Sequence, residues 1–396
     1  MDRTILTVLL ATCALGCQER DMGWPPYAFA ANVEMGPQVA CVTDRTARVT
    51  WRTLGHVRGD VEARLGGGEW SVARGSEGSG RDHDVLLEGL APDSVVEYRM
   101  LQNGQPNGPI HRFRTALKPG DSGFTFAVIG DTGSGGADQY AVRRQLTALN
   151  PSFVLHVGDI AYDHGSRVEV IRRHFVPYRD SVASRPWYVA WGNHDVVTNG
   201  GEELRALFRF PWSTPAGINR YYAFDWGDAR VWALDLHVDW SAESDQLRWL
   251  KADLAKSGAR WKFVFMHYPP YSASPYARGF RKLWERLRKV LCPVLEKHGV
   301  DLVFSGHTHG YERTYPVRAG ERAGSADGPD FERPGGPIYV ISGGGGKRLN
   351  KPGRAWWTAV YERDHQVCAV RVNGNRLVLR SVGKDGQELD RLTIEK

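Results

Sequence analysis

Hydrophobic positions change their spacing once along the chain, near Lys118. From Val33 to about this point, short segments such as ARVTWRT, DVEARLGGGEW and IHRFRTA alternate between apolar and polar residues and are separated by turns rich in Gly, Pro and Asp. An alternation with a period of two is typical of strands with one buried face, and short strands at this spacing predict a β-sandwich. We therefore expect a small all-β domain over residues 32–118.

Beyond this point the apolar runs are continuous and alternate with amphipathic stretches. FTFAVI, SFVLHV, RPWYVAW, ARVWALDL, WKFVFM and DLVFSG have the length of buried strands, whereas SAESDQLRWLKADLAKSG and GFRKLWERLRKVLCPVLEKHG have the spacing of helices. Continuous apolar strands with helices between them predict an α/β layered fold. Near the end, QVCAVRV and RLVLRSV flank NGN, which favours a hairpin of added antiparallel strands. This second domain is expected to span residues 122–396.

The N-terminal segment differs in composition from both predicted domains. MDRTILTVLLATCALGC contains Arg3 and then an apolar run, Ile5 to Leu15, that is too short to span a bilayer and resembles a secretory signal. The small residues before Cys17 resemble a bacterial lipobox, in which that cysteine is lipidated; an ordinary signal peptide cleaved nearby is the alternative. Residues 1–17 are thus predicted to be a lipoprotein-type signal and 18–31 a tether. The protein is expected outside the cytoplasm, lipid-anchored to the cell envelope, or otherwise secreted or periplasmic.

Composition narrows the functional classes. The chain has 396 residues, 42% of them hydrophobic and 24% charged, which favours two soluble domains with real cores. The net charge is +6, but the basic residues are scattered, so no nucleic-acid partner is expected. If Cys13 and Cys17 belong to the signal, three cysteines remain, and their spacing fits no zinc site. Cys41, Cys292 and Cys368 are expected to be packing residues, with one disulfide or none.

Five of the apolar runs end in polar residues that can bind metal ions. They deliver, in order, Asp131; Asp159 and Tyr162; Asn193, His194 and Asp195; His267; and His307 with His309. Ligand sites in α/β sheets form at the carboxyl ends of strands, so these side chains are expected to converge on one crevice. One metal ion would not need so many ligands, whereas two would if one carboxylate bridges them. The mixed oxygen and nitrogen set suits Fe, Zn or Mn, and two such ions about 3.5–4 Å apart can clamp a phosphate.

The order and spacing of GDTG, GDIAY, GNHD, VFMH and GHTHG resemble the metallophosphoesterase superfamily. The tyrosine of GDIAY, the VFMH pattern and the stretches GHTHGYERTYP and PIYVISGGGG are similar to its purple acid phosphatase branch. The first domain resembles fibronectin type III domains at Trp51, at Tyr98 of LEGLAPDSVVEYR and at FRT, which fits the usual layout of that branch. The resemblance implies a layered β-sandwich flanked by helices, preceded by a small fibronectin type III-like sandwich.

The resemblance also implies a role for each candidate residue. A ferric site would consist of Asp131, Asp159, Tyr162 and His309. A site for a divalent ion, Zn, Mn or Fe, would consist of Asp159, Asn193, His267 and His307, with Asp159 bridging the two. His194 would lie outside both ligand sets and contact the phosphate, oriented by Asp195.

The implied function is an exported acid phosphatase-type hydrolase that cleaves phosphate monoesters by attack of a metal-bound hydroxide. A phosphodiesterase would need the same metals and a wider cleft. A surface binding protein with an inactive catalytic domain is a third interpretation, which the intact ligand set disfavours. Small phosphorylated molecules are the expected partners, with a membrane engaged only through lipid at Cys17.

The chain departs from the family in one respect. Many members place further histidines between the VFMH and GHTHG motifs, near the substrate, but HYPPYSASPYARGF holds none after His267. Tyr268, Tyr271, Tyr276 and Arg278 are candidates to replace them, and packing is the expected role of the first two.

Overall fold

The computed structural model describes residues 30–211, 220–324 and 328–396. The predicted signal at 1–17 and most of the predicted tether lie outside this part of the chain. Among the described residues, no helix has both the length and the apolar composition that crossing a membrane requires.

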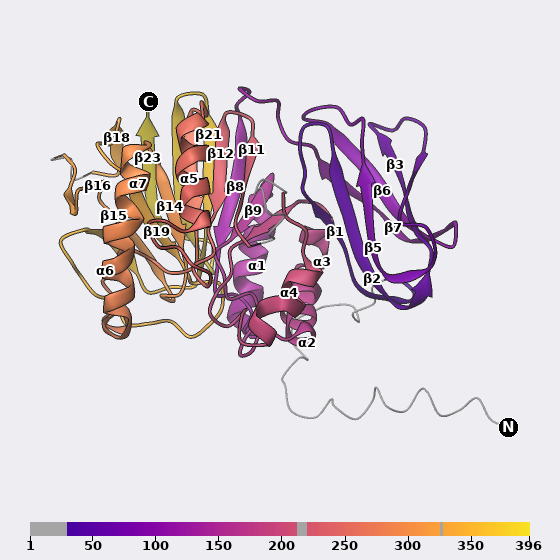
Figure 1. Cartoon of the computed structure of the whole chain (residues 1–396), viewed down its shortest axis with the longest axis horizontal. Coiled ribbons are helices and arrows are strands. Elements are labelled where there is room, and N and C mark those ends of the chain that lie inside the picture. Colours follow the sequence, from indigo (N-terminus) through magenta and orange to yellow (C-terminus); the bar gives the residue numbers. More distant parts are fainter. Residues whose placement is uncertain (1–29, 212–219, 325–327) are drawn as a thin grey trace.

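Residues 33–114 form a small β-sandwich of two antiparallel sheets (Figure 1). One sheet has the order β1-β2-β5 and the other β4-β3-β6-β7. Trp51 on β2 is buried in the core, as the alternating pattern predicts, and its ring stacks on His83. The arrangement is consistent with a fibronectin type III-like domain. Its strands are β1 (Val33–Ala40), β2 (Ala47–Val57), β3 (Gly59–Leu65), β4 (Ser71–Arg74), β5 (Gly80–Leu87), β6 (Val95–Gln102) and β7 (Gln105–Arg114).

Two seven-stranded sheets form the second, larger part of the chain. The first has the order β10-β9-β8-β21-β22-β23-β18, with β8, β9 and β10 parallel. Its strands are β8 (Phe124–Ile129), β9 (Phe153–His156), β10 (Trp187–Val189), β18 (Asp330–Glu332), β21 (Gln366–Asn373), β22 (Arg376–Gly383) and β23 (Glu388–Glu395). The predicted hairpin is confirmed, since β21 and β22 pair antiparallel around Gly374.

The second sheet has the order β11-β12-β13-β14-β19-β15-β20, and β12, β13, β14 and β19 are parallel. Its strands are β11 (Tyr222–Trp226), β12 (Ala229–Ala233), β13 (Trp261–Phe265), β14 (Leu302–Ser305), β15 (Tyr311–Thr314), β19 (Ile338–Ser342) and β20 (Thr358–Glu362). A short ribbon, β16 (Val317–Arg318) and β17 (Glu321–Arg322), lies outside both sheets.

The two sheets pack face to face, which explains the continuous apolar runs. Phe126 on β8 contacts Phe263 on β13 and Phe304 on β14, with ring centroids 5.2 and 6.1 Å apart. Val264, next to Phe263, points to the opposite face and joins a second core cluster with Leu250 of α5. Because β13 is covered on both faces, each of its positions must be apolar or shielded.

Helices cover the outer faces of the sheets, so the structure confirms the layered α/β fold (Figure 1). Helix α3 lies beside β1 of the N-terminal sandwich, whereas α5 and α6 cover β13 and β14. The helices are α1 (Ala137–Leu149), α2 (Arg167–Val170), the π-helical η1 (Ile171–Phe175), α3 (Val176–Val182), η2 (Asn199–Gly201), α4 (Glu202–Leu207), α5 (Asp245–Lys256), η3 (Pro275–Phe280), α6 (Arg281–Val290) and α7 (Cys292–Lys297).

Polar contacts join the two parts of the chain. The Tyr98 hydroxyl in the sandwich donates to the carbonyl of Ala183, at 2.8 Å. The hydroxyl of Tyr188, in the larger part of the chain, donates to the carbonyl of Val42 in the sandwich, at 3.3 Å. Both tyrosines are buried, so each hydroxyl needs a partner and finds it across the interface.

The three cysteines in the described part of the chain are free. Cys292 and Cys368 are fully buried packing residues, as expected, and Cys41 is partly buried. Burial raises the pKa of each thiol to about 12, so none is a reactive thiolate at neutral pH.

Candidate metal centre

The candidate residues lie together where the parallel strands of both sheets end. Asp131 follows β8, Asp159 follows β9, and Asn193 follows β10 in the first sheet. His267 follows β13 and His307 follows β14 in the second sheet. Since the sheets pack face to face, their carboxyl ends meet at one edge, and the crevice predicted from the sequence forms there.

Three candidate ligands have a left-handed backbone. The φ angles of Asp131, Asp159 and His307 are +57°, +55° and +64°. Asp, Asn and His tolerate this region better than most residues, but it costs about 1–3 kcal/mol each and is typical of functional sites. In this chain it turns each side chain sharply back toward the centre after its strand ends.

The glycines that precede the ligands make room for them. A Cβ atom on Gly192 would lie 2.1 Å from Oδ1 of Asp159, and a Cβ on Gly306 would lie 2.5 Å from Oδ2 of Asp131. Both distances are shorter than any real contact, so a larger residue would displace a carboxylate. The GNHD and GHTHG motifs therefore need glycine for space at the site.

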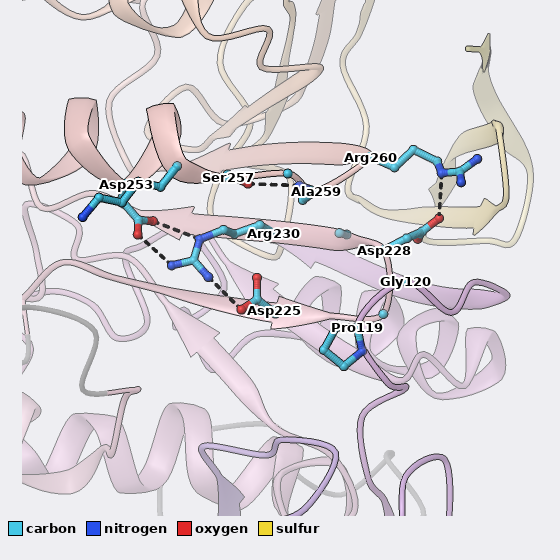
Figure 2. A pocket seen from close by; sticks show the side chains of 13 residues that line it. Pro119, Gly120, Asp225, Asp228, Arg230, Asp253, Ser257, Ala259 and Arg260 are labelled. Atoms are coloured by element: carbon cyan, nitrogen blue, oxygen red, sulfur yellow. Dashed lines mark hydrogen bonds and ion pairs between the residues drawn. The ribbon is translucent and has the colours of Figure 1, made fainter.

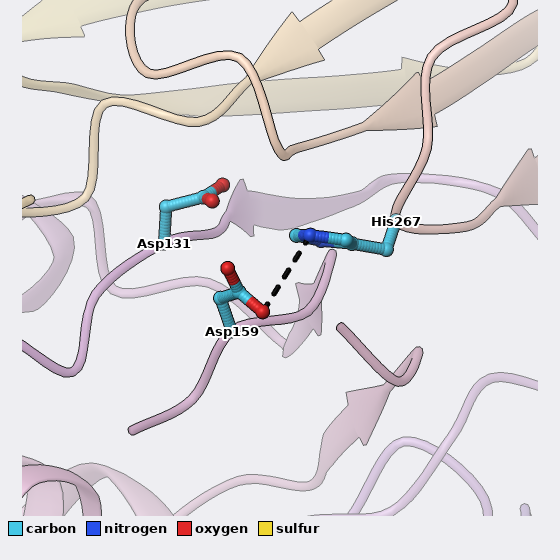
Figure 3. A group of neighbouring side chains, drawn as sticks. All are labelled: Asp131, Asp159 and His267. Carbon is cyan, nitrogen blue, oxygen red and sulfur yellow. Dashed lines mark ion pairs between the residues drawn. The ribbon is translucent and has the colours of Figure 1, made fainter. Parts of the chain in front are cut away.

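The centre of the site is a buried triad. Ligand atoms of Asp131, Asp159 and His267 all lie within 4.8 Å of one another, and Figure 3 shows the three side chains converging from different strand ends. The Nε2 atom of His267 lies 3.5 Å from Oδ1 of Asp159. Carboxylates and imidazole arranged at this separation can hold a transition-metal ion.

A backbone contact fixes the His267 tautomer. Its Nδ1 atom lies 2.8 Å from the carbonyl oxygen of Val157, which can only accept, so Nδ1 carries the proton. When the ring is neutral, Nε2 carries no proton and faces Oδ1 of Asn193 at 3.1 Å as well as the Asp159 carboxylate. Three electron-rich atoms thus face one another without a proton between them. Their repulsion is relieved if a cation lies among them, so these residues fit a metal ion.

His307 completes this side of the site. Its Nδ1 atom lies 2.9 Å from the same oxygen of Asn193, and its Nε2 is buried and has no hydrogen-bonding partner among the described residues. Burial, followed by the charge of neighbouring histidines, lowers the pKa of His307 to about 2. The imidazole is therefore neutral, as a metal ligand must be.

Tyr162 and His309 lie on the other side of the triad. The Tyr162 hydroxyl is 3.1 Å from Oδ1 of Asp131 and 3.3 Å from Nε2 of His309. His309 donates from Nδ1 to the carbonyl of Arg348 at 2.8 Å, so Nε2 is the nitrogen that faces Asp131 and Tyr162. Burial, and then the two aspartates, hold the pKa of Tyr162 well above its usual value. Its phenolate form therefore needs a strong positive charge nearby.

Asp195 does not orient His194, and that prediction is wrong. Its buried carboxylate accepts three backbone N–H groups, those of Asp159, Ile160 and Gly192, each at 2.8 Å. The geometry of the two turns explains this, because the N–H groups of Asp159 and Ile160 in one and of Gly192 in the other all point at this carboxylate. Asp195 thus holds the Asp159 turn in place rather than acting on a proton.

His194 is held by other contacts. Its Nδ1 atom donates to the carbonyl oxygen of Asp163 at 2.8 Å, and its ring lies on Tyr162 with centroids 4.5 Å apart. Its backbone N–H donates to Oδ1 of Asp159 at 3.0 Å. Its side chain therefore lies beside the ligand set with Nε2 free, consistent with a position outside it.

Lys347 is a neighbour of the site that the sequence motifs did not predict. Its ammonium group lies 4.1 Å from the centroid of the Tyr162 ring and 2.9 Å from Oδ1 of Asp163. Its backbone N–H donates to the carbonyl of Asp131 at 3.1 Å. In the sequence, the glycine run before Lys347 was the feature that pointed to this position. The run lies close to the site, since a Cβ atom on Gly343 would lie 3.0 Å from Oδ2 of Asp131.

A hollow of about 520 Å³ lies at the amino ends of β12 and β13, away from the candidate ligands. Its charged groups pair with one another, as Figure 2 shows. Arg230 lies 2.7 Å from Asp225 and 2.9 Å from Asp253, and Arg260 lies 3.5 Å from Asp228. The hollow contains none of the residues that the motifs predict.

Comparisons with known proteins find phosphoesterases and purple acid phosphatases. The calcineurin-like phosphoesterase family matches residues 124–311. Purple acid phosphatase 18 of Arabidopsis thaliana is 27% identical over 81% of this chain and 72% of its own length. Acid phosphatase type 7 of Mus musculus is 29% identical over 86% of this chain and 85% of its own length. Purple acid phosphatase 21 of Arabidopsis thaliana is 30% identical, but only 59% of its length is covered.

A solved structure shares the fold. Purple acid phosphatase PPD1 from yellow lupin (Lupinus luteus) seeds superposes with a TM-score of 0.81, 20% identity and coverage of 91% of this chain and 74% of that one. The catalytic-domain match, the relatives aligned over most of this chain, the shared fold and the clustered ligands lead to one assignment. The chain is a purple acid phosphatase-like metallophosphoesterase, a hydrolase of phosphoric ester bonds whose homologues form a metal-dependent family.

Proposed function

We propose that this protein is a binuclear phosphatase that hydrolyses phosphate monoesters outside the cytoplasm. The observation that carries the proposal is the cluster of carboxylate, amide and imidazole atoms around Asp159, which has ligand candidates on both sides. Fe³⁺ would be held by Asp131, Asp159, Tyr162 and His309. A divalent ion, Zn, Mn or Fe, would be held by Asp159, Asn193, His267 and His307.

The chemistry of the donor set supports this division. Phenolate and carboxylate are hard anions that favour a trivalent ion, whereas a neutral amide and two imidazoles suit a divalent ion. When bound, the two ions would supply Lewis-acid activation of the ester and of water. Small phosphorylated molecules are the proposed substrates, and the net charge of +6 is compatible with their negative charge.

The colour of the protein tests the ferric assignment. A tyrosinate bound to Fe³⁺ absorbs visible light by charge transfer, so the purified protein should be purple or pink. Lys347 over the Tyr162 ring favours the phenolate further. Tyr162→Phe should lose the band and keep its fold, because the ring remains. A colourless iron-loaded protein, or a Tyr162→Phe variant that keeps the band, would exclude Tyr162 as the iron ligand.

His194 is the proposed contact to the phosphate and the proton donor to the leaving group. The Asp163 carbonyl holds its Nδ1, so Nε2 is the nitrogen available for transfer. A positioned general acid typically contributes about 10²–10⁴-fold. His194→Ala should therefore reduce kcat/KM strongly for alkyl phosphates and weakly for nitrophenyl phosphate, whose leaving group needs little protonation.

The measurement is kcat/KM against the pKa of the leaving group, for the wild type and for His194→Ala. The slope should become steeper in the variant. Parallel slopes would mean that the proton comes from Tyr276, Arg278 or a bound water instead. Including diesters in the same series distinguishes the monoesterase from a diesterase with the same metals.

Membrane attachment at Cys17 is the proposed route to the cell surface. Cys17 follows an apolar run and small residues in the sequence ALGC. A single residue would carry the lipid, so Cys17→Ser should move the protein from the membrane fraction to the soluble fraction, which immunoblotting detects. A wild-type protein that is already soluble, with a mature N-terminus at another residue, would refute the anchor.

A further inference from the structure

Three aromatic side chains surround the His307 imidazole. The ring centroids of Phe280, Tyr268 and Tyr276 lie 4.4, 4.7 and 5.5 Å from the imidazole centroid. All three come from the segment after His267 in which the family's further histidines are missing. One wall of the site is therefore aromatic where an imidazole would otherwise be expected.

Tyr276 is the exposed member of this wall. Its side chain lies on η3 and is 45% exposed, whereas Tyr268 and Phe280 are only partly exposed and His307 is buried. The ring packs on Phe280 with centroids 5.3 Å apart, so it is supported from within the protein. A large ring open to solvent beside buried ligands offers a surface for another planar group.

The segment that carries Tyr276 is tied to the rest of the site. The backbone N–H of Ala273 donates to Glu312 at 2.8 Å, and the Ser274 hydroxyl donates to the carbonyl of Lys351, also at 2.8 Å. The hydroxyls of Ser272 and Thr308 are 3.2 Å apart, which links the segment to the turn that carries His307. The backbone just before Tyr276 is therefore restrained before any ligand arrives, which lowers the entropy lost on binding.

We propose that Tyr276 is a stacking surface for the leaving group and that the preferred substrates are phosphate monoesters of planar aromatic alcohols. This inference rests on the proposed phosphatase function, because the phosphate must bind beside His307. An aromatic ring joined directly to the ester oxygen then comes close to Tyr276, at the 4.5–7 Å centroid separations that aromatic pairs prefer. An alkyl group at the same place has no face to stack and loses that contact.

Binding of two non-hydrolysable analogues tests the inference without the chemical step. Titration calorimetry on the full, metal-containing protein would compare phenylphosphonate with methylphosphonate at a pH where both are dianions. The wild type should bind the phenyl analogue roughly tenfold more tightly, since a stacked ring pair adds to the area buried. Tyr276→Ala should reduce this ratio to roughly threefold or less, and Tyr276→Phe should keep it.

Trp356→Ala is the matched control. Trp356 is 48% exposed, similar to Tyr276, but its ring contacts Tyr271 and Trp357 rather than His307. This variant should keep the wild-type ratio. Both substituted residues are exposed, so both variants should fold, and circular dichroism would verify this.

Each outcome is decisive. A wild-type protein that binds both phosphonates equally, or a Tyr276→Ala variant that keeps the full preference, overturns the stacking surface while leaving the phosphatase intact. A preference lost in Tyr276→Phe as well would assign the effect to the hydroxyl rather than the ring and also overturn it. If neither phosphonate nor inorganic phosphate binds and no ester is hydrolysed, the proposed function fails, and the stacking surface fails with it.

Discussion

Asp159→Asn should retain well under two metal ions per chain and lose nearly all phosphatase activity. Asp159 lies between the two sets of ligands, with His267 on one side at 3.5 Å and Tyr162 on the other. A neutral amide in its place removes a negative charge from both sets. Lewis-acid stabilisation is worth several kcal/mol and each 1.4 kcal/mol is tenfold in rate, so kcat/KM should fall by roughly a thousandfold or more.

Metal analysis of the dialysed protein, together with kcat/KM for nitrophenyl phosphate, measures both effects. Asp225→Asn is a suitable control, because its side chain is 53% exposed and lies in the hollow at the other end of the strands. That variant removes the same charge and should keep two ions and wild-type turnover. An Asp159→Asn variant with full metal content and normal turnover would exclude the bridging role.

Local patterns predicted the strands and the ligand positions for a physical reason. A strand buried on both faces, such as β13, is apolar at every position except Lys262 near its start, so its end is visible where polar residues begin. In parallel strands, those ends lie at one edge. The convergence of Asp131, Asp159, Asn193, His267 and His307 could therefore be predicted from five separate stretches of sequence.

Contacts made through the backbone could not be predicted in this way. His267 and His309 are held by the carbonyls of Val157 and Arg348, and any residue type supplies a carbonyl. The same limit explains the error on Asp195. In the sequence, the adjacent His194 is the obvious partner of Asp195. In the structure, the Asp195 carboxylate accepts three backbone N–H groups instead, and these contacts exist only in the folded chain.

The sequence patterns assign no role to His174, but its burial in the structure affects how the stability of the protein depends on pH. It lies on the π-helical η1, is fully buried, and neither ring nitrogen has a hydrogen-bonding partner in the described part of the chain. The rings of Phe175, Trp187 and Phe208 contact it with centroids 5.0–5.6 Å away. Burial lowers its pKa from 6.5 to about 3.

The direction of the pH effect follows from this shift. The native imidazole stays neutral down to a pH of about 3, whereas the imidazole of the unfolded chain takes up a proton below about 6.5. The unfolded state therefore binds more protons in between, and the stability of the native state falls as the pH falls through this window. At pH 5 the loss from this one residue is about 2 kcal/mol relative to neutral pH.

His174→Phe should therefore stabilise the protein, and more so at pH 5 than at pH 7.5. Urea unfolding of both proteins at both pH values gives the double difference, which should be about 2 kcal/mol in favour of the variant at pH 5. The steric cost of the slightly larger ring is the same at either pH, so it cancels in the double difference. Any loss of metal ions at low pH also cancels, because both proteins have the same metal ligands. His56→Phe, at an exposed histidine, should show a double difference near zero. An equal change in stability at both pH values would mean that His174 is protonated, or finds a partner, in the native state.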